Sequence, residues 1–175
     1  MLTKSLLATL LAVSVATASP ITKRDASTVL SDLKTILSDV ETLESVVSTW
    51  DGSLLTALTI LTDYNNLKSA LDTAITDTAA TSALSDSDSS SITSEVQTLG
   101  TTIVATLDTI IDKESVAASA GVTSTLLSSI ETLETDTNTL GADLEAIATS
   151  TDAETIASVL SEVDAAFSSA VAAYS

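Results

Sequence analysis

The sequence predicts an all-α protein, built as an elongated antiparallel bundle of about five amphipathic helices. Apolar residues recur at alternating steps of four and three through most of the chain, which is the period of a helix with one buried face. Strict alternation of apolar and polar residues, typical of a half-buried strand, persists nowhere. Because the chain has no cysteine or histidine and only one Trp, two Tyr and one Phe, its core must consist mainly of aliphatic side chains.

The chain begins with a predicted signal peptide over residues 1–18. This segment contains one lysine, a short apolar run and the small-residue ending Ala16-Thr17-Ala18, a pattern that signal peptidase cleaves, here after Ala18. The apolar run is too short to span a bilayer, so we expect no transmembrane segment here. The sequence therefore predicts a secreted protein.

A short pro-segment is predicted over residues 19–24, ending in the dibasic pair Lys23-Arg24. Furin-like proteases of the secretory pathway cut such pairs, although the two residues could also be ordinary surface charges. Residues 25–175 are then expected to form a single helical-bundle domain.

The first helix of that domain is predicted from Val29 to Trp50. It carries an apolar heptad seam sustained for three repeats, formed by Val29, Leu33, Ile36, Val40, Leu43, Val47 and Trp50. A single helix cannot bury such a stripe alone, so the rest of the chain or an apolar ligand must cover it. Asp51-Gly52 is expected to end this helix.

The second helix is predicted over residues 54–80, with Leu54, Leu58 and Leu61 on its stripe. A segment rich in Ser and Asp follows, and these residues favour turns and caps.

Helix three is predicted to begin after Ser85, which is expected to be its N-cap. Asp86 and Asp88 then lie in the first turn, where negative charge suits the helix dipole. The stripe continues to about Ser119, and Gly121 ends the helix.

The fourth helix carries a stripe from Leu126 to Ile147, and the last helix is predicted to open with a capping box from Thr151 to Glu154. Gly100 and Gly141 fall inside helices three and four, where glycine costs about 1 kcal/mol relative to alanine. These glycines could be tolerated surface positions or could permit a close helix crossing. Alternatively, they could leave room for a guest molecule beside the neighbouring leucines.

The charge excludes several partners. The formal net charge is −18 for the whole chain, and residues 25–175 keep 24 acidic residues against three lysines, a formal charge of −21. Nucleic acid and anionic lipid surfaces would be repelled. The absence of cysteine excludes a disulfide scaffold.

The sequence predicts no enzyme, metal site or cofactor. Ser31 and Lys34 match the S-x-x-K spacing, but the S-D-N and K-T-G elements that accompany it in β-lactamases are missing. Asp86-Ser87-Asp88 resembles the start of a calcium loop, yet Ser91 and Gln97 replace its required Gly and Glu. Helix capping explains these aspartates better.

The aliphatic stripes leave two interpretations open. A bundle of this kind can hold a long-chain lipid between its helices or lie on an oily surface, or its stripes can form a plain core without a ligand. The periodicity alone does not choose between them.

The sequence also resembles a known family. The features that carry the resemblance are a signal peptide, Lys23-Arg24, the seam from Val29 to Trp50-Asp51-Gly52, the Leu84-Ser85-Asp86 entry to helix three, the Ile92–Ile111 ladder before Asp112-Lys113, and an alanine-rich last helix with Phe167 and Tyr174. In these features the chain is similar to the fungal hydrophobic surface-binding protein A family. That family includes antigenic cell-wall galactomannoproteins.

The resemblance implies a secreted, non-enzymatic protein, extracellular or in the cell wall, that engages hydrophobic surfaces or a fatty acid. Some relatives help to recruit a secreted cutinase-like hydrolase. A structural, O-mannosylated wall protein without a ligand is the alternative. No family motif marks the ligand residues, so we predict the lipid-lining positions from the stripes: Leu33, Val40, Leu61, Leu99, Ile103, Leu133, Leu140 and Leu144.

Overall fold

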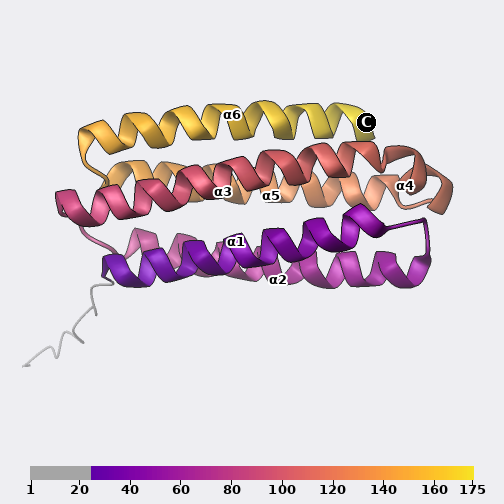
Figure 1. Ribbon diagram of the computed structural model, residues 1–175, viewed down its shortest axis with the longest axis horizontal. Coiled ribbons are helices and arrows are strands. Elements are labelled where there is room, and N and C mark those ends of the chain that lie inside the picture. The colour runs from indigo at the N-terminus through magenta and orange to yellow at the C-terminus, as the bar shows by residue number, and fades with distance from the viewer. Residues whose placement is uncertain (1–24) are drawn as a thin grey trace, which may run out of the picture.

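The computed structural model describes residues 25–175, and the regular elements in this part of the chain are all helices. They are connected by short segments (Figure 1). They are α1 (Ala26–Thr49), α2 (Leu54–Ala79), α3 (Asp86–Asp112), α4 (Glu114–Ala120), α5 (Thr123–Ile147) and α6 (Ser150–Tyr174). The all-α prediction is confirmed. The predicted signal peptide and pro-segment, with Ala18, Lys23 and Arg24, lie outside the described residues.

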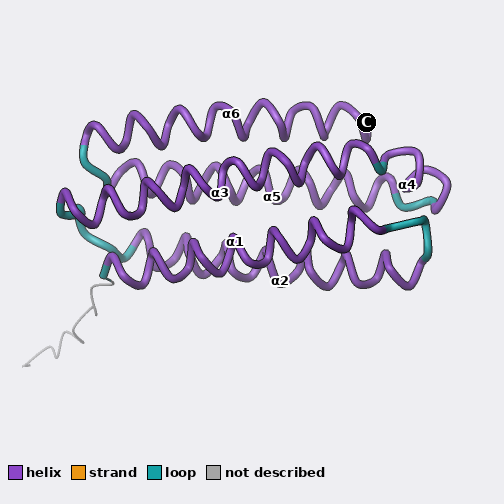
Figure 2. Tube along the Cα trace, in the orientation of Figure 1, coloured by secondary structure: helices purple, strands orange, loops and turns teal. Residues whose placement is uncertain are grey.

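The five long helices form a closed ring. Going round it, α1 packs against α2, α2 against α5, α5 against α6, α6 against α3, and α3 against α1. Helices that follow one another in the sequence run antiparallel (Figure 2), as short connections require. Not all neighbours in the ring are neighbours in the sequence, however. Helix α3 lies between α1 and α6, and these three helices run in the same direction.

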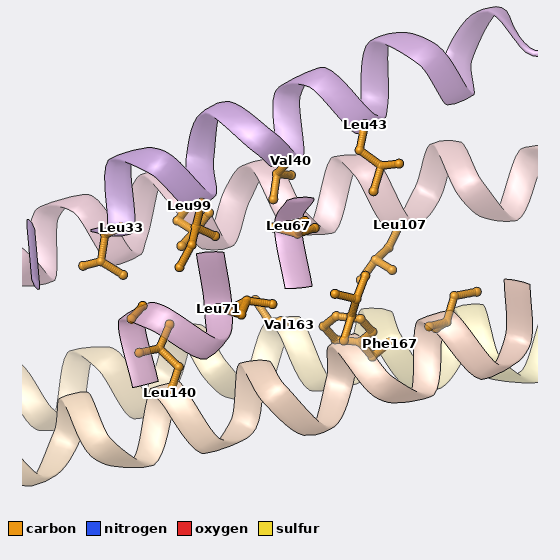
Figure 3. Close-up of a cluster of buried hydrophobic side chains, with 14 of the residues drawn as sticks. Leu33, Val40, Leu43, Leu67, Leu71, Leu99, Leu107, Leu140, Val163 and Phe167 are labelled. Atoms are coloured by element: carbon orange, nitrogen blue, oxygen red, sulfur yellow. The ribbon is translucent and has the colours of Figure 1, made fainter. Parts of the chain in front are cut away.

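The core occupies the centre of this ring. The seam of α1 is buried from Val29 to Val47, and Trp50 closes it. Figure 3 shows seam residues of α1, such as Leu33 and Val40, projecting towards side chains of other helices. The heptad pattern therefore identified the buried face of this helix.

Side chains cap two helix starts, of which the cap at Ser85 was predicted, whereas α1 begins at Ala26, before the predicted Val29. The Asp25 carboxylate accepts a hydrogen bond from the Thr28 amide at 2.9 Å and caps α1. Ser85 caps α3, since its Oγ accepts from the Asp88 amide at 3.3 Å, with Asp86 and Asp88 in the first turn. Both caps satisfy amide groups that the first turn of a helix leaves unpaired.

Two helix boundaries differ from the predictions. Helix three does not continue to Ser119; it ends at Asp112, and the backbone changes direction at Lys113 before the separate helix α4 begins. Gly121, with φ of +73°, ends α4 rather than α3. Glycine adopts this left-handed conformation without the steric penalty of a side chain.

The capping box from Thr151 to Glu154 is also wrong, because α6 already begins at Ser150. Its N-cap, Thr149, donates its hydroxyl to Asp152 at 2.9 Å. The Thr149 amide donates to Ser89 Oγ at 3.0 Å, so a contact with α3 fixes the start of α6. Such a tertiary contact is invisible to a local sequence motif.

Gly100 and Gly141 permit a close helix crossing. A Cβ atom placed on Gly100 would lie 2.3 Å from Val159 Cγ1, and one on Gly141 would lie 2.4 Å from Leu160 Cδ1. Both contacts come from α6, which therefore approaches α3 and α5 closely at these points. Side chains of α6 occupy most of the space beside the glycines, which leaves only a cavity of about 30 Å³ there.

Among the described helices, α6 is the one long and apolar enough, by length and composition, to cross a membrane. It packs in the ring with Ile156, Val163 and Phe167 buried. Much of its remaining surface is alanine and serine, which makes the helix apolar on average without a broad oily face. Its place in the bundle accounts for this composition.

Candidate functional site

A large apolar cavity lies at the end of the bundle where the α1–α2 connection, α4 and the end of α6 meet (Figure 1). Its volume is about 360 Å³, against roughly 150 Å³ for an engineered apolar cavity that holds benzene. We call it the wide cavity. It is lined by Leu43, Val47, Trp50, Leu54, Ala57, Leu58, Ile60, Leu61, Tyr64, Ile110, Lys113, Val122, Thr125, Leu126, Ser129, Ile130, Leu133 and Tyr174.

Two smaller apolar cavities continue along the bundle axis. The middle cavity, of about 50 Å³, shares Leu43, Ile110 and Leu133 with the wide cavity. The narrow cavity, of about 30 Å³, shares Leu99 and Ile103 with the middle one. Neighbouring cavities thus share side chains in their walls, and rotamer changes of these shared side chains would widen the space between them along the axis.

The mouth of the wide cavity is formed by the start of α2. Leu54, Leu58 and Leu61 line the cavity, yet they are 65%, 61% and 40% exposed. Leu55 is 76% exposed and does not line the cavity. The sequence placed the first three on a buried stripe, but the space beneath them is the cavity rather than packed core. Exposed leucines gathered in this way mark a binding surface.

All eight predicted lipid-lining residues border at least one of the three cavities. Leu61 and Leu133 border the wide cavity; Val40, Leu99, Ile103 and Leu133 border the middle one; Leu33, Leu99, Ile103, Leu140 and Leu144 border the narrow one. The axis of the bundle therefore brings them together. Their contact with a bound lipid remains a prediction.

Sequence reasoning missed most of the wide cavity. Its lining includes Trp50, Tyr64 and Tyr174, and Phe167 borders the middle cavity. These are all four aromatic residues of the chain. In so aliphatic a sequence, the aromatic positions were a usable signal, because large flat side chains suit the walls of ligand sites.

The polar groups of the wide cavity are largely paired with the protein itself. Trp50 Nε1 donates to the Ser53 carbonyl at 3.0 Å, and the Tyr174 hydroxyl donates to the Ile110 carbonyl at 2.7 Å. Burial raises the pKa of Tyr174 to about 12, with a smaller contribution from the charge of Glu114. The phenol is therefore a neutral donor at physiological pH.

Among residues 25–175, no catalytic constellation accompanies the cavities. Ser31 and Lys34 are both exposed on α1 and line none of them. No group of three or more acidic residues in this range could hold a metal ion. The lining of the wide cavity is instead almost wholly apolar.

Comparison with known proteins agrees with this geometry. The profile of the hydrophobic surface binding protein A family, HsbA, matches residues 26–146. The chain belongs to this family. The comparison with curated protein sequences finds no match.

Solved structures share the fold of this HsbA-family chain. The crystal structure of AFMP4P in complex with palmitic acid is 45% identical, covering 86% of this chain and 100% of that one, with a TM-score of 0.85. Ligand binding domain 1 of the Penicillium marneffei MP1 protein, complexed with arachidonic acids, is 18% identical, covering 86% and 99%, with a TM-score of 0.80. Domain 2 of that protein, also with arachidonic acids, is 19% identical, covering 88% and 98%, with a TM-score of 0.80.

Proposed function

We propose that this protein binds a long-chain fatty acid in the axial cavities. The observation that carries the proposal is the wide cavity of about 360 Å³, almost wholly apolar, followed along the axis by two smaller apolar cavities. An extended acyl chain has the shape of this series. The similarity to AFMP4P, whose structure contains palmitic acid, supports the same ligand class.

Hydrophobic burial supplies the affinity. Each methylene group transferred from water into an apolar site contributes about 0.8 kcal/mol. The aliphatic and aromatic lining of the wide and middle cavities provides such a site. Most side chains shared by neighbouring cavities are Leu and Ile, with Thr137 as the polar exception, so the tail would displace mainly aliphatic side chains.

The test is a variant that blocks the axial passage. Leu133 borders both the wide and middle cavities and is buried, so Leu133→Trp should prevent palmitate uptake. The matched control is Leu37→Trp, because Leu37 is half-buried on α1 and borders none of the cavities.

The readout is native mass spectrometry of the delipidated proteins after incubation with palmitate. We expect a palmitate adduct on the wild type and on Leu37→Trp, and none on Leu133→Trp. Circular dichroism verifies that both variants remain helical. A wild-type protein that takes up no fatty acid would refute the proposal, and so would a folded Leu133→Trp variant that binds like the wild type.

A second candidate function, adsorption to hydrophobic surfaces, is favoured by the exposed start of α2. Leu54, Leu55 and Leu58 are each more than half exposed. Leu55 lines none of the cavities, so Leu55→Ser separates the two functions. This variant should adsorb less to alkyl-coated beads while its palmitate binding stays unchanged; equal adsorption would exclude this patch as the adsorbing surface.

We also propose that the protein is secreted, after cleavage behind Ala18 and behind Lys23-Arg24, and acts outside the cell or in the cell wall. N-terminal sequencing of the exported protein should begin at Asp25; a start at Ser19 would mean that the dibasic pair is not cut.

Recruitment of a cutinase-like hydrolase is tested by co-sedimentation of such an enzyme with polyester particles, with and without this protein. A heavily O-mannosylated product that binds neither lipid nor surface would favour the structural wall-protein alternative.

A further inference from the structure

Lys113 is the charged residue of the cavity system. Among the side chains that line the wide, middle and narrow cavities, it is the single one with a formal charge. It lies between α3 and α4, at the point where the backbone changes direction. In the sequence, Lys113 only follows an apolar ladder, and no motif there indicates a role for it.

The Lys113 ammonium group retains hydrogen-bonding capacity. It is half-buried, and its Nζ donates to the Trp50 carbonyl at 3.1 Å. An ammonium group has three donors, so this bond leaves two. The ion pairs within residues 25–175 join Lys68 to Asp72 and Asp136. Lys113 forms none, although the chain contains 24 acidic residues.

A cation at this position matters because the rest of the molecule repels anions. Residues 25–175 carry a formal charge of −21, and Glu114 is close enough to contribute to the raised pKa of Tyr174. A fatty acid that enters the wide cavity brings a carboxylate into this negative field. A charge-assisted hydrogen bond from a partly buried ammonium group is the local interaction that offsets the repulsion.

We propose that Lys113 binds the carboxylate of the fatty acid and so fixes its orientation. The head group then lies in the wide cavity, and the tail points along the axis towards Leu99. Fourteen residues of α3 and its C-cap separate these two positions, about 20 Å at the helical rise of 1.5 Å per residue. This inference rests on the proposed function and adds a specificity: the cavity distinguishes a free acid from a neutral lipid with the same tail.

The experiment compares laurate with dodecanol, which share one tail and differ in head group. Binding to the delipidated protein is measured at a pH of about 8, where the carboxylate is ionised. Trp50 lines the wide cavity and is the single tryptophan of the chain, so its fluorescence reports occupancy. Lys113→Gln removes the charge but keeps a donor for the Trp50 carbonyl.

We expect Lys113→Gln to weaken laurate binding about 10- to 100-fold and to leave dodecanol binding unchanged. Lys113→Arg should retain the preference for laurate, since it keeps the charge. Lys34→Gln is the matched control, because Lys34 is an exposed lysine on α1 that borders none of the cavities; it should bind both lipids like the wild type.

The outcomes distinguish the two proposals. A Lys113→Gln variant with the wild-type ratio of laurate to dodecanol affinity would overturn the role of Lys113, even if both affinities fell together, because a merely structural change weakens both lipids alike. If the wild type binds neither lipid, the proposed function itself fails.

Discussion

Alanine substitutions at Gly100 and Gly141 test the packing of α6 against α3 and α5. In an isolated helix, either change should stabilise by up to about 1 kcal/mol, because glycine is the poorer helix former. In this protein the new Cβ would lie 2.3 Å from Val159 Cγ1 or 2.4 Å from Leu160 Cδ1. Overpacking of a core typically costs about 1–3 kcal/mol, so the two effects oppose each other.

The two sites should differ in how easily the neighbour yields. Val159 is β-branched and stiff about χ1, and its clashing atom is attached directly to Cβ. The closest atoms of Leu160 are the two terminal methyl groups, at 2.4 and 2.5 Å, which a rotamer change can move. We therefore expect Gly100→Ala to lower the free energy of unfolding by about 1–2 kcal/mol, and Gly141→Ala to be within about 1 kcal/mol of the wild type.

Urea unfolding followed by far-UV circular dichroism measures both values. A double-mutant cycle identifies the cause, because Val159→Ala should relieve most of the penalty of Gly100→Ala. Gly121→Ala is the control for backbone strain alone, since a Cβ added there would meet no atom within 4 Å and φ is +73°. If Gly100→Ala stabilises the protein, or if Val159→Ala brings no relief, the close-crossing explanation is wrong.

Three further predictions concern the cap, the buried phenol and the cavity. Ser85→Ala should destabilise the protein by about 1 kcal/mol and Ser85→Gly by only a few tenths, as measured by urea unfolding; equal losses would contradict the capping role. Tyr174→Phe should cost about 1 kcal/mol at neutral pH through the lost bond to the Ile110 carbonyl. Burial raises the pKa of Tyr174 to about 12, so the folded state disfavours the phenolate. The wild type therefore loses stability as pH rises from about 10 to about 12, whereas Tyr174→Phe has no phenol at this position to ionise. The difference in free energy of unfolding between the two proteins should narrow over that pH range. Across saturated fatty acids, affinity measured by Trp50 fluorescence should rise about fourfold per methylene and level off once the tail fills the axial cavities; an affinity independent of chain length would refute burial of the tail.

The five long helices were predictable because each carries its own periodic signal, whereas the short helix α4 was predicted as part of helix three. The seam from Val29 to Trp50 identified the buried face of α1, and Ser85 identified the start of α3. These features depend on residues within a turn or two of one another. The start of α6 was not predictable in the same way, because it depends on the bond between Thr149 and Ser89 of another helix.

The candidate site was predictable only in part, for a related reason. A stripe shows which residues face inwards but not how far apart the helices stand, so Leu140 and Leu61 looked alike in the sequence. In the structure Leu140 is 3% exposed and Leu61 is 40% exposed at the cavity mouth. Lys113 was missed because its importance comes from its position between two helices and beside Trp50, which only the fold reveals.

The cavities decrease in volume along the bundle axis because the helices lie closer together at one end of the ring than at the other. Five helices arranged in a ring enclose more axial space than four, and the aliphatic, aromatic-poor composition gives few large side chains to fill it. At one end Gly100 and Gly141 let α6 approach closely, and the cavity bordered by both glycines measures only about 30 Å³. At the other end the exposed leucines of α2 leave the mouth open, and the cavity reaches about 360 Å³. The axial space is therefore narrow beside the glycines and open past α2, so a ligand should enter past α2, with its head group left beside Lys113.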